Sequence, residues 1–323
     1  MLDINNCKTI DGDEYNSFFQ KSSHLFSNEF FYSIDHIEYS DLYFEKVQKR
    51  SFAVINKDGT ALAFVPIASV NDRDITFYEK PLKVFYNTEF NLSTDERKQL
   101  DKFIFKHIQS IAVENNLSHI RTTFNSTLGS SIFKPGDDFE AEIEGIIDLS
   151  LSEDLILKSV RKSYRSLINW GKRNLELRIM NKDSGDFNRF EEFRMFHLEV
   201  SGKETRSIES WKKQFELITK GKAFLVLAYL DEKLVSANYT THGCEEAYYS
   251  VGVNDRDLMA KRVAIGQFPL LTSILEAKRI GIKTFNLGYL GPSFPNEKDR
   301  NIALFKKGFC SSYRLKNILN SKL

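Results

Sequence analysis

The chain has 323 residues, of which 41% are hydrophobic and 13% aromatic, with 45 Lys and Arg against 44 Asp and Glu. This composition excludes an intrinsically disordered protein and is typical of a globular chain with room for two cores. The three cysteines show no paired spacing, the first 15 residues lack the pattern of a signal peptide, and no apolar stretch approaches 18 residues. We therefore expect a cytoplasmic protein without a membrane span.

The near-zero net charge hides an asymmetry between the two halves of the chain. Residues 1–150 carry 15 Lys and Arg against 24 Asp and Glu, a net charge of −9, whereas residues 151–323 carry 30 against 20, a net charge of +10. The basic half is suited to attract anions such as phosphates. Two oppositely charged halves that attract each other would give the same pattern.

The predicted elements of the first half alternate between helices and strands. Turn residues Lys57 to Gly59 separate two apolar strands, and Ser93 with Glu96 forms a capping-box pattern at the start of a long helix. In chain order we expect a helical segment at 13–47, strands at 51–56, 60–67 and 76–80, a helix at 94–116, a strand at 117–124, a loop at 126–138 and a strand at 139–149.

The second half begins with a basic amphipathic helix that Ser152 caps. In chain order we expect helices at 153–174, 186–200, 207–219 and 262–280, and strands at 176–181, 246–253 and 283–288 with a hairpin at 221–243.

The two halves repeat one order of elements. The hairpins at 49–70 and 221–243 are each followed by an aromatic strand, a long helix and a short strand. This duplication predicts an α/β (α+β) fold of two modules, each a mixed sheet flanked by helices, with domains at 1–150 and 151–323. Ligands favour clefts between modules, so we expect a cleft there, with the first module as its wall.

Two arginines of the basic helix are candidate phosphate ligands. Arg161 and Arg165 lie four residues apart, so one continuous helix would place both on the same side, where they could hold a pyrophosphate together. A charge run of this kind also fits a solvated helix face.

The aromatic strand and its hairpin partner supply further candidates. Tyr239 and Tyr249 are candidate substrate-binding residues, although core packing explains such tyrosines equally well. Glu245 and Glu246 stand at the entry of the strand, where Glu246 is our candidate catalytic base for an amine.

The last predicted strand and the segment after it carry three more candidates. Asn286 and Tyr289 stand where the strand ends, the usual place for ligands in α/β proteins; we assign them substrate-binding and catalytic roles respectively. Lys306 lies between aromatic residues, where it could stabilise an oxyanion. A lysine snorkelling from an aromatic core is the alternative.

Several classes of site are excluded by absent motifs. The sequence has no Gly-rich phosphate loop ending in Gly-Lys-Ser/Thr, no dinucleotide fingerprint and no Gly-x-Ser-x-Gly element. The six histidines have no metal-ligand spacing, so we expect no metal.

The basic helix with Arg161, Lys162 and Arg165, the tyrosine-rich strand, and Phe-Asn-Leu-Gly with the later Phe305-Lys306 pair together resemble the FemAB-like branch of the GNAT acyltransferases. Members consist of two tandem GNAT modules, so the resemblance covers the whole architecture, while its diagnostic residues lie within 153–310. It implies transfer of an acyl or aminoacyl group to an amine, with Arg165 contacting substrate phosphate and Lys306 as the active-site cation.

GNAT enzymes that use acyl-CoA usually show Q/R-x-x-G-x-G/A before the long helix. Residues 261–267 keep Arg262 and Gly266 from this pattern, which the resemblance makes the candidate ligands of acyl-CoA as co-substrate. Many members that use aminoacyl-tRNA carry a coiled-coil arm, and none is present here.

The resemblance therefore predicts an N-acyltransferase that acts on a small molecule or a nucleotide-linked glycan such as an amino-sugar nucleotide. Aminoacyl transfer from tRNA to a peptidoglycan precursor and a non-catalytic module that binds an anionic ligand are the alternatives. We expect no DNA partner.

Overall fold

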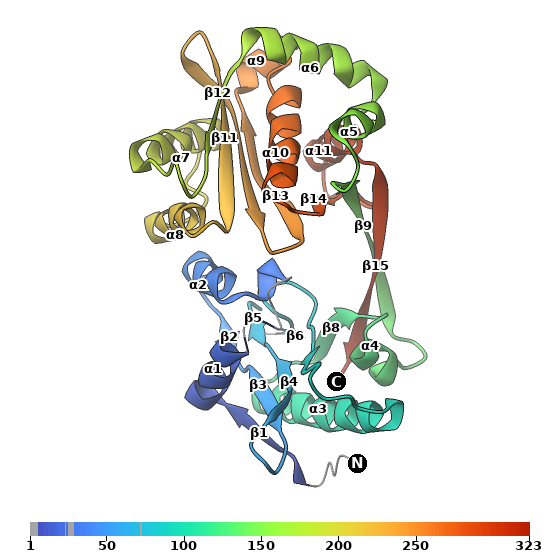
Figure 1. Cartoon of the computed structure of the whole chain (residues 1–323). Helices are drawn as coiled ribbons and strands as arrows, with labels where there is room; N and C mark the ends of the chain where they lie inside the picture. The colour runs from blue at the N-terminus through green and yellow to red at the C-terminus, as the bar shows by residue number, and fades with distance from the viewer. Residues whose placement is uncertain (1–5, 23, 25–28, 72) are drawn as a thin grey trace. The chain divides into compact units, whose positions relative to one another are not determined.

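The computed structural model describes residues 6–22, 24, 29–71 and 73–323 (Figure 1). The chain forms two compact units, each with its own hydrophobic core. Described residues up to 24, with 31–142 and 316–323, form the first unit, and residues 29, 30 and 143–315 form the second.

The boundary between the units lies earlier than the predicted one at 150. The chain leaves the first unit within β9 (Asp138–Asp148) and returns to it within β15 (Ser312–Lys322). The end of β15 pairs with β8 (His119–Thr123), which is why residues 316–323 separate from the rest of the predicted domain 151–323.

The first unit places helices on both faces of a sheet ordered β1-β3-β4-β7. One face packs against the apolar side of α3, and the other packs against Tyr15 and Phe19 of α1. The elements are β1 (Lys8–Asp11), α1 (Gly12–Lys21), η3 (Phe30–Tyr32), α2 (Ile34–Tyr43), β2 (Gln48–Lys49), β3 (Phe52–Ile55), β4 (Ala61–Val65), β5 (Ala68–Ser69), β6 (Asp74–Ile75), β7 (Phe85–Tyr86), α3 (Thr94–Glu114) and α4 (Thr127–Ile132).

The hairpin and the long helix of this unit are confirmed. β3 pairs with β4 across a turn in which Gly59 has a φ of +77°, and the capping box of Ser93 and Glu96 is present at the start of α3. The chain between the parallel strands β6 and β8 includes β7 and α3, so α3 is part of a crossover connection.

Three predictions for this unit are wrong. The loop at 126–138 contains α4, because the side chain of Ser126 accepts the N–H of Gly129 and thereby caps a short helix. The strand at 76–80 is a turn, since Tyr78 and Glu79 have positive φ. The segment 13–47 is divided into α1, η3 and α2; residues 23 and 25–28 lie outside the described part.

The second unit is a sheet ordered β10-β11-β12-β13-β14-β9, antiparallel except for the pair β13 and β14. Helices α6 and α10 cover one face, and α7 and α8 cover the other (Figure 1). The elements are α5 (Glu153–Ser159), α6 (Lys162–Asn174), β10 (Glu176–Met180), α7 (Phe187–Ser201), α8 (Ile208–Thr219), β11 (Ala223–Leu230), β12 (Lys233–His242), β13 (Glu246–Asn254), α9 (Arg256–Ala260), α10 (Gln267–Arg279), β14 (Thr284–Tyr289) and α11 (Glu297–Lys307).

Strands β13 and β14 pair only at their beginnings, over Glu246–Tyr248 and Thr284–Asn286. In β13 the pairing with β12 skips Ser250, because Tyr239 pairs with Val251 while Thr240 pairs with Tyr249. This bulge twists β13. Helix α10 joins the two strands as a crossover, like α3 in the first unit.

The predicted continuous helix at 153–174 is wrong, because extended backbone at Val160 and Arg161 separates α5 from α6. The N–H of Arg161 bonds the carbonyl oxygen of Gly308 at 2.8 Å instead of continuing the helix, and Val160 is buried. The helix predicted at 262–280 starts later, at Gln267.

In the described residues no helix is long and apolar enough to cross a membrane.

Candidate active site

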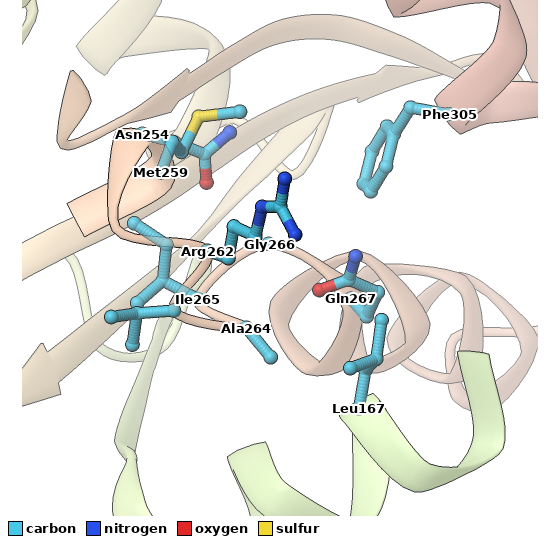
Figure 2. Close-up of a pocket in the computed structure, with 10 residues that line it drawn as sticks. Leu167, Asn254, Met259, Arg262, Ala264, Ile265, Gly266, Gln267 and Phe305 are labelled. Carbon is cyan, nitrogen blue, oxygen red and sulfur yellow. The ribbon is translucent and has the colours of Figure 1, made fainter. Parts of the chain in front are cut away.

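A cavity of about 270 Å³ lies at the N-terminal end of α10 (Figure 2). The loop 262–266 forms its floor. Its walls come from the elements around it, namely Leu167 of α6, Asn254 of β13, Met259 of α9, Gln267 of α10 and Phe305 of α11. Five separate elements of the second unit therefore meet at the start of one helix.

The start of α10 is open because no side chain caps it. Gly266 occupies the N-cap position, and the first intrahelical bond runs from the N–H of Leu270 to the carbonyl oxygen of Gly266. Pro269 has no N–H, so Gln267 and Phe268 are the residues of the first turn whose N–H groups precede that bond. A Cβ at Gly266 would lie 3.3 Å from Asn254 Oδ1 and 3.6 Å from Phe305 Cζ, so a larger residue would enter the cavity.

Three polar side chains converge on the cavity. Figure 2 shows the guanidinium of Arg262 between the amides of Asn254 and Gln267, with the ring of Phe305 opposite. Asn254 Oδ1 and Gln267 Oε1 are buried and have no hydrogen-bond partner among the described residues. The cation and the helix N-terminus suit an anion, and the two amide oxygens suit N–H or hydroxyl donors of a ligand.

Lys306 follows Phe305 on α11 and reaches the opening between β13 and β14. Its Nζ lies 5.6 Å from the ring centroid of Tyr249, and a Cβ on Gly288 of β14 would be 3.6 Å from it. Burial lowers the pKa of Lys306, an effect that Cys310 and Asp299 partly oppose. Within the described chain its ammonium group makes no hydrogen bond or ion pair, so its charge is available to a ligand.

Tyr249 lies beneath Lys306 on the side of the sheet that α10 covers. Its hydroxyl is 3.1 Å from the amide of Asn238, and burial raises its pKa, which keeps it protonated. The Asn238 amide satisfies both of its ends when its nitrogen donates to this hydroxyl and its oxygen accepts the N–H of Leu270 at 3.1 Å. The hydroxyl proton of Tyr249 is then free for another acceptor.

Glu246 and Asn286 come together on the other face of the sheet, away from Lys306. Both guanidinium Nη atoms of Arg314 donate to the Glu246 carboxylate, at 2.9 and 2.7 Å, and the Asn286 amide donates to Glu246 at 2.8 Å and to Glu144 at 3.1 Å. The pair with Glu246 raises the pKa of Arg314. A carboxylate held by a bidentate arginine is a poor proton acceptor, so this arrangement does not favour Glu246 as a base.

The remaining candidates lie apart from the cavity. The Tyr239 hydroxyl donates to the carbonyl oxygen of Gln214 at 2.9 Å and its ring stacks on Phe193, which makes it a core residue. Tyr289 is 39% exposed and donates to the carbonyl oxygen of Ser293 at 2.7 Å.

The two arginines of the broken helix do not act as a pair in this structure. Arg161 Nη2 donates to the carbonyl oxygen of Leu304 at 3.3 Å, whereas Arg165 Nη2 donates to that of Lys158 at 2.7 Å. The continuous helix on which their joint grip on a pyrophosphate was predicted is broken at Arg161, and the phosphate-binding role of the two arginines stays a prediction.

Of the residues predicted from the sequence, Arg262, Gly266, Tyr249 and Lys306 lie around the start of α10 and the adjoining end of α11. Other residues of this region were not predicted. Asn254 directly follows the predicted strand at 246–253 and ends β13, a position from which polar side chains commonly contact ligands, so it could have been found. Arg314 could not, because nothing in its local sequence indicates that it pairs with Glu246. Among the described residues no cluster of three or more His, Cys, Asp or Glu side chains could hold a metal ion.

No family model matches this sequence, and no curated protein matches it at a significant level. Solved structures match the whole chain. FemX aligns with a TM-score of 0.64 at 13% identity over 98% of this chain and 97% of its own. A tandem GNAT protein from the clavulanic acid biosynthesis pathway aligns at 0.57 and 12% over 98% of both chains, and L-PGS from Bacillus licheniformis at 0.56 and 14% over 96% of this chain and 91% of its own.

At these identities the comparison shows the fold. The chain has a FemAB-like arrangement of tandem GNAT-like modules, which confirms the predicted α/β (α+β) class.

Proposed function

We propose that this protein is an N-acyltransferase that transfers an acyl group from acyl-CoA to an amine, with its reaction centre in the second unit. The observation that carries the proposal is the uncapped start of α10, which opens into a cavity beside Lys306, a half-buried lysine that makes no ion pair among the described residues. The fold shared with FemX and with a tandem GNAT protein supports the same class of reaction.

The residues at the cavity fit the diphosphate of acyl-CoA. Arg262 supplies a positive charge, the N–H groups of Gln267 and Phe268 supply hydrogen-bond donors, and Gly266 leaves room for close approach. The oxygens of Asn254 and Gln267 accept from amide or hydroxyl groups of the same molecule.

The reaction needs a neutral amine, an activated carbonyl and stabilisation of the oxyanion between them. The amine nitrogen forms a bond to the carbonyl carbon, the carbon–sulfur bond breaks, and the proton lost by the amine balances the thiolate released. Lys306 supplies the positive charge for the oxyanion, and Tyr249 supports it as a protonated hydrogen-bond donor. The acceptor that we propose is an amino sugar or another amine on a nucleotide-linked glycan, in line with the net charge of +10 in residues 151–323.

The direct test is thiol release from acetyl-CoA in the presence of amino-sugar nucleotides. Lys306→Ala should lower kcat by about 100-fold or more, as loss of an oxyanion-stabilising group does. Lys307→Ala is the matched control, because Lys307 is the next residue of the same helix and lies over the exposed ring of Tyr313 instead. Equal activity of the two variants would remove Lys306 from the mechanism.

A second candidate is aminoacyl transfer from charged tRNA to a peptidoglycan precursor. The unpartnered oxygens of Asn254 and Gln267 fit this donor equally well, because they would accept from ribose hydroxyls as readily as from a pantetheine amide. Transfer of a labelled amino acid that RNase abolishes, together with no thiol release from acetyl-CoA, would select this donor. Tight binding of a nucleotide sugar without turnover from either donor would identify a non-catalytic module.

A further inference from the structure

The break between α5 and α6 contacts the C-terminal end of α11. The last carbonyl groups of a helix lack intrahelical partners. Here the carbonyl oxygen of Leu304 accepts from the side chain of Arg161 at 3.3 Å, and that of Gly308, just after the helix, accepts from the backbone N–H of Arg161 at 2.8 Å. The Tyr164 hydroxyl donates to the carbonyl oxygen of Phe305 at 3.4 Å.

Packing at this contact leaves little room for movement. A Cβ on Gly308 would lie 2.2 Å from Cε2 of Tyr164, so the backbone at Gly308 packs directly against the Tyr164 ring. The Tyr164 ring lies 6.0 Å from that of Phe305 and 5.4 Å from that of Phe309, and the Arg161 guanidinium covers its other side at 5.0 Å. Arg161 and Tyr164 therefore enclose the residues on either side of Lys306.

We propose that Arg161 is a positioning residue that holds the last turn of α11 and so directs Lys306 toward the opening between β13 and β14. The inference rests on the proposed role of Lys306. It also explains why the helix breaks at Arg161: the break turns the Arg161 N–H toward Gly308 and its side chain toward Leu304. Arg165, one turn further along α6, has its own partner at Lys158 and no described contact with α11.

The test measures Lys306 directly and does not require turnover. Competitive labelling with acetic anhydride, read by mass spectrometry across a range of pH, reports the reactivity and the pKa of the Lys306 amine. In Arg161→Ala the last turn of α11 should loosen and expose Nζ, so the pKa should rise toward that of an ordinary lysine. The groups that face Lys306, namely Asp299, Cys310 and the ring of Tyr249, are unchanged in this variant.

Three comparisons make the result specific. Arg165→Ala removes an arginine from the same helix and should leave the labelling of Lys306 as in the wild type. Arg161→Lys keeps the charge but not the forked guanidinium, and should give an intermediate pKa. Where turnover is measurable, Arg161→Ala should lower kcat about tenfold or more without changing KM for the donor, since a small misplacement of a reacting group costs rate rather than binding.

Thermal melting shows whether each variant is folded. If Arg161→Ala does not fold, the labelling experiment uses Arg161→Lys in its place. Wild-type labelling of Lys306 in a folded Arg161 variant would overturn the inference. Absence of turnover in the wild type would count against the proposed reaction alone, because the labelling result stands without it.

Discussion

The long crossover helices of the two units begin in opposite ways. At the start of α3, Ser93 and Glu96 satisfy each other's backbone N–H groups, and the Glu96 carboxylate occupies the positive end of the helix. At the start of α10 there is glycine instead, no side chain caps the helix, and a cavity with Arg262 on its wall takes the place of the carboxylate.

This difference is the point at which we propose that the two modules diverge in function. A helix N-terminus binds an anion only if its own side chains leave it open. The capping box stabilises α3 and closes its N-terminus, whereas glycine at the N-cap of α10 costs only about a few tenths of a kcal/mol and leaves the N-terminus of that helix open. We infer that the first unit has a structural role and the second binds the donor.

The largest effect is expected from giving α10 a capping side chain at its N-terminus, as α3 has. Gly266→Asp places a capping carboxylate at the N-cap, beside Asn254, and should raise KM for the acyl donor about 100-fold, or about 2.7 kcal/mol. Titration of donor binding measures the effect, and Gly266→Ala, which adds only a methyl group, should weaken binding less. Unchanged donor affinity in Gly266→Asp would show that the donor does not bind at α10.

Arg262 at the cavity should contribute less to donor affinity than the open N-terminus of α10. Arg262→Ala should raise KM for the donor about tenfold, because a hydrogen-bonded ion pair contributes about 1.5–3 kcal/mol when partly shielded and less when exposed. The control is Lys261→Ala, which removes the positive charge of the exposed residue next to Arg262 and leaves Arg262 in place. Measuring donor affinity of both variants over a range of salt concentrations separates a specific contact of Arg262 from general electrostatic attraction. Equal losses of donor affinity in the two variants would indicate general attraction.

The pH dependence of the reaction should report the burial of Lys306. Because burial lowers its pKa, the ammonium loses its proton at a lower pH than an exposed lysine would, so kcat should fall earlier on the alkaline side. Lys306→Arg stays charged throughout, and whatever activity it keeps should show no such fall. Any rise in rate from deprotonation of the acceptor amine is common to both proteins. A wild-type profile without an alkaline fall would contradict the requirement for a charged Lys306.

The smallest effect concerns the closed helix. Ser93→Ala removes the side-chain acceptor at the N-cap of α3 and should lower the free energy of unfolding of the first unit by about 1 kcal/mol. Urea denaturation measures the loss, and donor affinity should stay unchanged. A loss of donor affinity in this variant would contradict the assignment of a purely structural role to the first unit.

Much of the fold could be predicted because its signals are local. The turn at Gly59 and the capping box of Ser93 and Glu96 depend on residues a few positions apart, so the sequence shows them directly. The order of elements, the duplication and the assignment of Arg262 and Gly266 to one loop follow from the same short-range patterns. Alternation along β13 also places Glu246 and Tyr249, which are three residues apart, on opposite sides of the sheet, before the bulge at Ser250. What could not be predicted was the distant partner that a side chain meets, such as Arg314 for Glu246.

The sequence by itself determined the two repeated modules, the charge difference between the halves, and the place of Arg262 and Gly266 in the loop before α10. Only the tertiary structure decided that the basic helix breaks at Arg161, that Glu246 is held by Arg314, and that Lys306 is half-buried and forms no ion pair among the described residues. Each of these outcomes depends on a partner brought from a distant part of the chain, such as Gly308 for Arg161. Helical periodicity and charge spacing describe neighbours along the chain, and they carry no record of such partners.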